Sequence, residues 1–389
     1  MTLRMYQYRL YPSKKQKEIL LNTFNICKEI YNNLLETSIK IYKETGKTLR
    51  KFDYNKQLTN KYPDVFSQVK QNISDRVDKS FKNFFRRCKD TSCKKKGFPR
   101  FKSRVHSITY PQFGFKFKSQ RRLNVSKIGN IPIVLHRIPK GKLKTMTIKR
   151  NRASQWFAIF SCEVKEETVK HPSAEKIGID VGIETFATIS NGETVDNPRH
   201  IIKAEKRLER LQRRVSRKIK GSNNRRKAIH RLAIQHVKVT NQRNDFLHKI
   251  SKNITQRYGF ISVENLNIKG MVQNHHLARY ISDASWNRFI QMLEYKAVTS
   301  GSTLVKVNPR NTSKTCSRCG TIVDMPLKQR MFNCPNCGFV SHRDLNASLN
   351  ILKVGQDLSE PNACEHDVRP SLKAIVDETG TTHNKLARS

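Results

Sequence analysis

The sequence has no continuous apolar run that approaches the eighteen or so residues that a membrane-spanning helix needs. Its opening residues alternate between polar and apolar types, unlike the continuous apolar core of a secretory signal peptide. Acidic residues are also scarce: 31 Asp and Glu stand against 76 Lys and Arg among 389 residues, a formal net charge of +45. These absences argue against a membrane protein and a secreted disulfide scaffold. Because so much positive charge repels itself in a compact chain, we expect a polyanionic partner.

The nine cysteines do not form the pattern of a disulfide scaffold. Their number is odd, five are scattered, and four fall into two close pairs. Such usage favours a reducing compartment, so we expect a cytoplasmic protein with no membrane association.

The first part of the chain predicts a β-module that is interrupted by a helical insertion. Residues 3–10 alternate as in a strand, and Ser13 then begins a stretch with a period close to 3.6. Helical patterning resumes over residues 62–89 and is followed by a basic turn at 94–104. Three strands are expected at 131–135, 145–149 and 156–163.

A second pattern begins after a linker at 171–173 and mixes strands with helices. The turn dipeptide Asn191-Gly192 predicts a hairpin. Residues 203–257 carry 18 Lys and Arg against 3 Asp and Glu and predict a basic helical hairpin, with its connection at 221–224. The other expected elements are strands at 176–182, 186–190, 259–264 and 303–308 and a helix at 286–299. The fold class is therefore α+β, with several domains.

Two C-x-x-C-G motifs give the most specific signal that spacing alone provides. Cys316 and Cys319 form the first pair, Cys334 and Cys337 form the second, and a glycine follows each pair. Four thiolates at this spacing can close a tetrahedral zinc site, and the glycines allow the tight turn around each pair of sulfurs. Because no open coordination position remains, the zinc is expected to be structural.

Three acidic residues occupy unusual positions for so basic a chain. Asp180 interrupts an apolar strand, Glu264 ends another, and Asp344 stands where a helix should begin. Three convergent carboxylates could hold two divalent ions about 3.5–4 Å apart, an arrangement suited to phosphodiester hydrolysis. The alternatives are ordinary: a strand-end Glu is usually a surface residue, and Asp is a favoured helix N-cap.

Seven short motifs, in this order along the chain, resemble those of the TnpB family, the OrfB-type proteins of transposons. They are Tyr8-Arg9-Leu10-Tyr11-Pro12, Gly97-Phe98-Pro99-Arg100-Phe101-Lys102, Gly178-Ile179-Asp180-Val181-Gly182, Gly221-Ser222-Asn223-Asn224-Arg225, Val263-Glu264-Asn265-Leu266, Thr312-Ser313-Lys314-Thr315-Cys316 and Arg343-Asp344-Leu345-Asn346-Ala347. The family is similar to type V CRISPR effectors in its RuvC-like nuclease domain.

The resemblance implies an RNA-guided DNA endonuclease with guide RNA and target DNA as partners. The oligomeric state stays open, and one monomer per RNA is favoured. It implies an RNase H-like RuvC domain with catalytic residues Asp180, Glu264 and Asp344 and two Mg²⁺ ions, and a prokaryotic, nucleoid-associated protein. It also implies a wedge-like, β-barrel-like N-terminal module. The expected domains are the wedge-like module at 1–12 and 97–170, a recognition-like helical insertion at 13–96, the RuvC-like domain at 172–310 and 339–353, a zinc ribbon that binds target nucleic acid at 311–338, and a disordered tail at 354–389.

Two rival functions remain open. A non-cleaving regulator could bind RNA and block DNA, although it would have no need of three acids. A DNA transposase of the RNase H-like class would use a similar acidic triad, so the triad does not exclude it.

Overall fold

The computed structural model describes residues 2–93, 95–165, 169–326, 329–359, 374–376 and 382–384. The chain forms two compact units, one of residues 1–166 and 377–389 and the other of residues 167–376. The first unit contains β1 (Thr2–Leu10), α1 (Lys14–Thr45), α2 (Lys51–Gln57), α3 (Ser67–Lys89), β2 (Ser107–Tyr110), β3 (Phe115–Ser119), β4 (Arg122–Val125), β5 (Gly129–Val134), β6 (Lys142–Arg150) and β7 (Trp156–Val164).

The seven strands form one antiparallel sheet in the order β2-β6-β7-β1-β5-β4-β3. β1 pairs along its whole length with β7, so the first and last strands of the unit lie side by side in the middle of the sheet. Phe115 and Phe117 of β3 pack against Phe160 of β7, with ring centroids 5.9 and 5.0 Å apart, although three strands separate β3 from β7 in the sheet. The sheet is therefore curled like a barrel, while β2 and β3 remain its edges.

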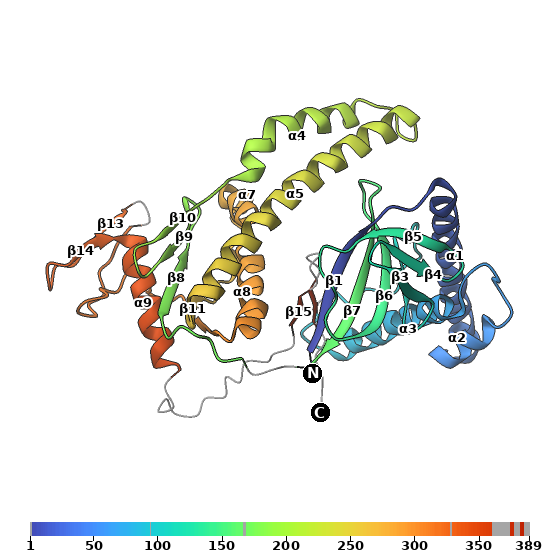
Figure 1. Cartoon of the computed structure of the whole chain (residues 1–389), viewed down its shortest axis with the longest axis horizontal. Coiled ribbons are helices and arrows are strands. Elements are labelled where there is room, and N and C mark those ends of the chain that lie inside the picture. Colours follow the sequence, from blue (N-terminus) through green and yellow to red (C-terminus); the bar gives the residue numbers. More distant parts are fainter. Residues whose placement is uncertain are drawn as a thin grey trace. The chain divides into compact units, whose positions relative to one another are not determined.

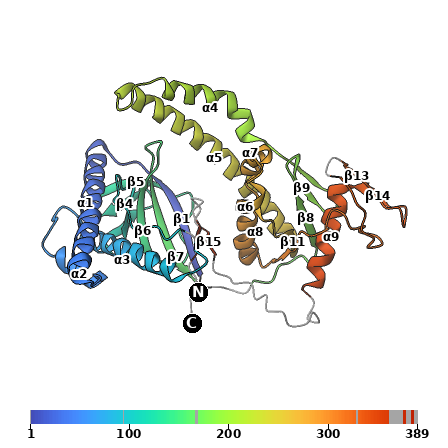
Figure 2. The ribbon, with the colours of Figure 1, turned by 180° about the vertical axis from the view of Figure 1, so that it is seen from behind.

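Helices α1 and α3 pack on each other and on β2 (Figures 1 and 2). The start of α1 is fixed by a capping box: the Ser13 hydroxyl accepts from the Gln16 N–H, and the Gln16 side chain accepts from the Ser13 N–H. This reciprocal pair satisfies two N–H groups that the helix itself cannot satisfy. The predicted helix start at Ser13 is confirmed.

The sequence pattern missed α2 and strands β2 to β4. It also began the second long helix too early: α3 starts at Ser67, and Tyr62 has a φ of +57°, which no α-helix allows. Strands β2 to β4 are only four or five residues long, too short for a clear alternation.

The second unit contains a mixed sheet and six helices in its described part. Its elements are β8 (Lys176–Val181), β9 (Thr185–Ile189), β10 (Thr194–Asp196), α4 (His200–Ser216), α5 (Asn223–Arg257), β11 (Phe260–Glu264), α6 (Ile268–Met271), α7 (His275–Ala284), α8 (Trp286–Ser300), β12 (Thr303–Val307), β13 (Met331–Asn333), β14 (Val340–His342) and α9 (Arg343–Asp357). The strands predicted in this region, the hairpin after β9 and the basic helical hairpin α4–α5 are all present. The predicted connection at 221–224 is displaced, because α5 begins at Asn223 with Ser222 as its N-cap.

The order of the main sheet is β10-β9-β8-β11-β12. β8, β9 and β10 pair antiparallel, whereas β8, β11 and β12 run parallel. One face of the sheet carries apolar side chains such as Ile177 and Ile179, which form a core with α5 and α8. Helix α9 covers the other face (Figures 1 and 2).

Helix α9 lies very close to the sheet because the contact residues are small. A Cβ on Gly178 would come within 2.1 Å of the Ser348 carbonyl oxygen, and one on Gly355 within 2.1 Å of the Ser262 hydroxyl oxygen. The Ser262 hydroxyl donates to the Ile351 carbonyl at 2.8 Å. These contacts fix the height and direction of α9 over β8 and β11.

Helix α9 continues through Asp357, so residues 354–357, predicted as the start of the tail, form its last turn. The signal was hidden because Gly355 packs by close approach and not by an apolar side chain. Beyond residue 359 the structure describes only β15 (Ala374–Val376) and β16 (Thr382–Asn384), two segments that a wholly disordered tail does not predict. The rest of the tail prediction lies outside the described residues. In the part of the chain that the structure describes, no helix is long and apolar enough to cross a bilayer.

Candidate acidic centre and four-cysteine site

Asp180 and Glu264 lie on neighbouring parallel strands. Ile179 of β8 pairs with Val263 of β11, so the residues that follow, Asp180 and Glu264, are also neighbours. Side chains alternate along a strand, and both carboxylates therefore project from the face that carries Gly178 and not from the apolar face. The two acids meet at the carboxyl ends of the strands.

Asp344 reaches the same end of the sheet from helix α9. Ser348 lies over Gly178. Gly355 lies over Ser262, which pairs with Gly178, and beside Phe260, two residues nearer the start of β11, so α9 runs back along the strands. Asp344 is one helical turn before Ser348, which places it at the strand ends. The structure thus brings together the three acids that the sequence analysis selected.

The other two carboxylates act electrostatically on Asp180. Burial, and then the negative charges of Glu264 and Asp344, raise the pKa of Asp180 to about 8, although Arg343 opposes the shift. Burial also raises the pKa of Glu264, while a hydrogen bond from the Thr312 hydroxyl opposes this. Without a cation, the centre therefore resists full ionisation.

The ordinary alternatives for Glu264 and Asp344 do not hold. Glu264 is only 8% exposed, so it is not a surface residue. The N-cap of α9 is His342, whose Nδ1 accepts from the Asp344 N–H at 3.4 Å, and Asp344 lies within the first turn. The Asp344 carboxylate lies 3.9 Å from both Arg330 and His342.

The four cysteines converge as the spacing predicted. All four sulfurs lie within 4.8 Å of one another. The Cys316–Cys337 and Cys319–Cys334 sulfur pairs are 3.7 and 3.5 Å apart. Tetrahedral zinc with bonds of about 2.3 Å requires sulfurs about 3.8 Å apart, so the quartet fits this ion.

Two similar turns and a small core build the cysteine site. The N–H of Gly320 donates to the Cys316 carbonyl at 2.9 Å, and that of Gly338 donates to the Cys334 carbonyl at 3.0 Å. The core beneath the turns consists of Cys316, Met325, Phe332 and Cys334, with Val323, Cys337 and Phe339 packed against it. Strands β13 and β14 pair antiparallel and complete a ribbon. So small a core would gain stability from a bound metal ion.

Two buried asparagines on α9 hold the entry to this ribbon, and the sequence analysis did not assign them a role. Asn346 accepts from the Ser317 N–H at 2.9 Å and donates to the Thr315 carbonyl at 2.8 Å. Asn350 donates to the carbonyls of Thr312 and Thr315 at 2.8 and 2.7 Å. Their spacing of four residues on one helix face was a signal that could have indicated a shared contact.

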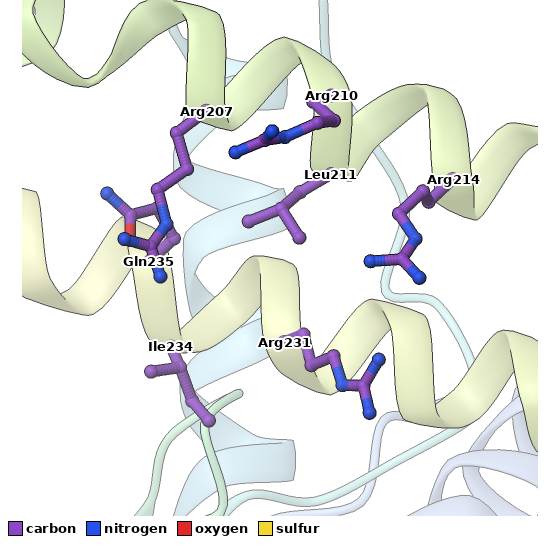
Figure 3. Close-up of a pocket in the computed structure, with 7 residues that line it drawn as sticks. All are labelled: Arg207, Arg210, Leu211, Arg214, Arg231, Ile234 and Gln235. Carbon is purple, nitrogen blue, oxygen red and sulfur yellow. The ribbon is translucent and has the colours of Figure 1, made fainter.

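A basic groove of about 550 Å³ lies between α4 and α5 (Figure 3). Four arginines line it: Arg207, Arg210 and Arg214 from α4 and Arg231 from α5. The acidic residues of α4 pair elsewhere, Glu205 with Arg279 and Glu209 with Arg213. Guanidinium groups gathered in this way are suited to phosphate oxygens.

Fold and sites define an α+β protein of two units with an acidic centre, a four-cysteine ribbon and a basic helical hairpin. Family models match three segments: "Probable transposase" (OrfB_IS605) at residues 159–275, "Cas12f1-like, TNB domain" at 286–351, and "Helix-turn-helix domain" (HTH_OrfB_IS605) at 1–47. Over residues 2–47 the structure has one strand followed by one long helix, and not two helices joined by a turn.

The chain belongs to the TnpB family. A Streptomyces pristinaespiralis protein named "Putative RNA-guided DNA endonuclease" is 33% identical to it over 387 residues, which cover 95% of this chain and 93% of that protein. The Escherichia coli protein of the same name, InsQ, is 28% identical over 383 residues, covering 91% and 92%. The solved structure of the mini-RNA-guided endonuclease CRISPR-Cas phi3 superposes with a TM-score of 0.50 at 9% identity, covering 91% of this chain and 92% of that one, and shows a similar fold.

Proposed function

We propose that this chain is an RNA-guided DNA endonuclease that hydrolyses phosphodiester bonds at Asp180, Glu264 and Asp344. The observation that carries the proposal is the meeting of three carboxylates at one end of a sheet in a chain of net charge +45. Acids at such a place, with the pKa of Asp180 raised to about 8, are typical of a functional centre. The names of the relatives support the same activity.

The sheet supports an RNase H-like interpretation of the second unit. Three antiparallel strands are followed by two parallel ones, in the order β10-β9-β8-β11-β12. Asp180 stands on the central strand, Glu264 on its neighbour, and Asp344 on the helix that covers both. We assign the second unit, apart from its ribbon, as the RuvC-like domain, and the first unit as the wedge-like module with its helical insertion.

The spread of the acids favours two cations over one. A single Mg²⁺ with bonds of about 2.1 Å holds its oxygen ligands within about 4.2 Å of one another. Among the described residues, the four cysteines form the group of potential ligands whose atoms all lie within 4.8 Å of one another, and the three carboxylates do not together meet this limit. Asp180, Glu264 and Asp344 would together hold the two Mg²⁺ ions.

Bound divalent ions would activate water and stabilise the leaving oxygen. The chain's own residues prepare the centre for this role. Asp180, Glu264 and Asp344 supply the negative charge that binds cations, and Arg343 is the positive neighbour that moderates their repulsion. Burial of Glu264 at the strand end keeps this carboxylate out of bulk water.

The basic groove of α4 and α5 is assigned to the backbone of the guide RNA or its duplex with target DNA. In such a system base pairing supplies the sequence specificity, and the protein contacts backbone and shape. Four arginines in one groove would bring several charge-assisted contacts to phosphates. The four-cysteine ribbon is assigned to structural zinc and to contact with target nucleic acid.

Cleavage of a matched DNA target by the reconstituted ribonucleoprotein tests the proposal. Wild-type protein should cleave the target with Mg²⁺ or Mn²⁺ and lose this activity in EDTA. The larger Ca²⁺ ion should support cleavage poorly. Asp180→Ala should abolish cleavage while RNA and target binding persist. Asp245→Ala is the matched control, because Asp245 is an exposed acid on α5 that pairs with Lys249.

The same assay separates the rival functions. A non-cleaving regulator would bind the target without cutting it in any divalent cation. A transposase would join labelled transposon ends to a second DNA. Full cleavage by the Asp180→Ala protein would refute the assignment of the acids.

A further inference from the structure

The hydrogen bond that orients the Glu264 carboxylate comes from Thr312, in the segment that leads into the ribbon, and not from the sheet. The Thr312 hydroxyl donates to Glu264 Oε1 at 2.5 Å. Both residues are buried, Thr312 at 6% and Glu264 at 8% exposure. The second acceptor near this hydroxyl is the Pro309 carbonyl at 3.2 Å, so the carboxylate is the closer partner. Glu264 thus receives a short, water-excluded hydrogen bond from a residue 48 positions later in the chain.

Helix α9 holds Thr312 in place. The Asn350 side chain donates to the Thr312 carbonyl at 2.8 Å, and the same amide donates to the Thr315 carbonyl. Asn346, one turn earlier, binds the next residues through Thr315 and Ser317. The segment that positions Glu264 is therefore fixed to the helix that carries Asp344.

The same segment enters the cysteine site directly. Cys316 follows Thr315, and its N–H donates to the Thr321 carbonyl at 2.8 Å, within the first cysteine turn. Two series of contacts therefore start at the ribbon. One leads through Thr312 to Glu264, and the other leads through α9 to Asp344. Closing the ribbon around its metal would hold both series in register.

We propose that Thr312 is a positioning residue: its hydroxyl orients the Glu264 carboxylate toward the cation site, and α9 and the ribbon hold Thr312 in position to do so. This inference rests on the proposed nuclease function. Partners of metal ligands orient those ligands, and their removal typically lowers metal affinity or activity 10–100-fold. A threonine that served only the fold would affect stability and leave cation affinity unchanged.

Three variants of the full-length chain test the proposal. Thr312→Val removes the hydroxyl and keeps the shape, whereas Thr312→Ser keeps the hydroxyl. Thr315→Val is the matched control, because the Thr315 hydroxyl donates to the Asn311 carbonyl at 2.9 Å and not to an acid of the centre. Zinc content of every variant is measured first by elemental analysis and should equal that of wild type.

The first readout is the Mn²⁺ concentration that half-saturates the rise in melting temperature of the protein, and the second is the Mn²⁺ dependence of target cleavage. Thr312→Val should need at least about tenfold more Mn²⁺ in both assays. Thr312→Ser should return close to wild type, and Thr315→Val should match wild type.

Wild-type Mn²⁺ affinity in Thr312→Val would overturn the positioning role, even if its melting temperature without Mn²⁺ falls. A loss of affinity in Thr315→Val equal to that in Thr312→Val would also overturn it, because the effect would then belong to the segment as a whole. If wild-type protein neither binds Mn²⁺ nor cleaves, the proposed nuclease function fails instead, and the two failures are distinguishable.

Discussion

Replacing Asp180 by Asn should stabilise the cation-free protein at neutral pH. Burial and two neighbouring carboxylates raise the pKa of Asp180 from its ordinary value of 3.8 to about 8. A pKa that is higher in the folded state means that stability is complete below pH 3.8 and falls as the pH rises through about 8. At pH 7 the folded protein is therefore destabilised, because it keeps largely protonated a carboxyl group that is ionised in the unfolded chain.

Each pH unit in this window changes the free energy of unfolding by about 1.4 kcal/mol, so the loss at pH 7 approaches about 4 kcal/mol. Asn removes the charge and keeps the volume, but its partly buried amide costs about 1–3 kcal/mol where it lacks partners. We therefore expect a net gain of about 1–3 kcal/mol. For a unit of this size the gain corresponds to a rise of roughly 2–10 °C in melting temperature.

The assay is thermal unfolding of wild type, Asp180→Asn and the control Asp245→Asn in EDTA at pH 5 and pH 7. The melting temperature of Asp180→Asn should clearly exceed that of wild type at pH 7. The difference should be much smaller at pH 5, where Asp180 destabilises the wild-type protein less. Adding Mg²⁺ should raise the melting temperature of wild type, because an ion that binds only the folded state stabilises it. It should not raise that of Asp180→Asn, which lacks the Asp180 carboxylate as a ligand. Equal melting temperatures at pH 7 in EDTA, or an advantage independent of pH, would refute the electrostatic argument for the centre.

Two further changes test the rest of the molecule. Cys334→Ser should lose zinc and loosen residues 311–340, as measured by elemental analysis and by hydrogen exchange, because metal binding in such small sites supplies folding free energy; retention of a full zinc equivalent would contradict the four-cysteine site. Arg231→Gln should weaken nucleic-acid binding and lower the slope of log affinity against log salt by about 0.7–0.9, the share of one phosphate. Lys249→Gln serves as its control, since Lys249 is already paired with Asp245, and equal slopes for the two variants would argue against the groove.

Features that depend on neighbours in the sequence were predictable. Ser13 begins α1 because a capping box needs only residues three apart. Asn191-Gly192 turns the chain between β9 and β10 because this dipeptide readily adopts the required backbone angles. The four cysteines converge because each pair lies on one short turn.

Features that depend on contacts between distant segments of the chain were not predictable from the sequence. Three short strands of the first unit gave no clear alternation, and their role follows from a curled sheet in which β3 packs on β7. The last turn of α9 was missed because Gly355 contributes a close approach and not an apolar side chain.

The acidic centre shows where the division lies. Sequence by itself determined which carboxylates to consider: Asp180 and Glu264 conflict with the apolar strands that carry them, whereas Asp344 stands at a helix start, an ordinary place for an Asp. Only the tertiary structure decided that β8 and β11 are parallel neighbours and that α9 runs back over them, which brings the three acids to one end of the sheet. Only the tertiary structure, too, placed the Thr312 hydroxyl on Glu264, because a hydrogen bond across 48 residues depends on packing and leaves no periodic trace in the chain.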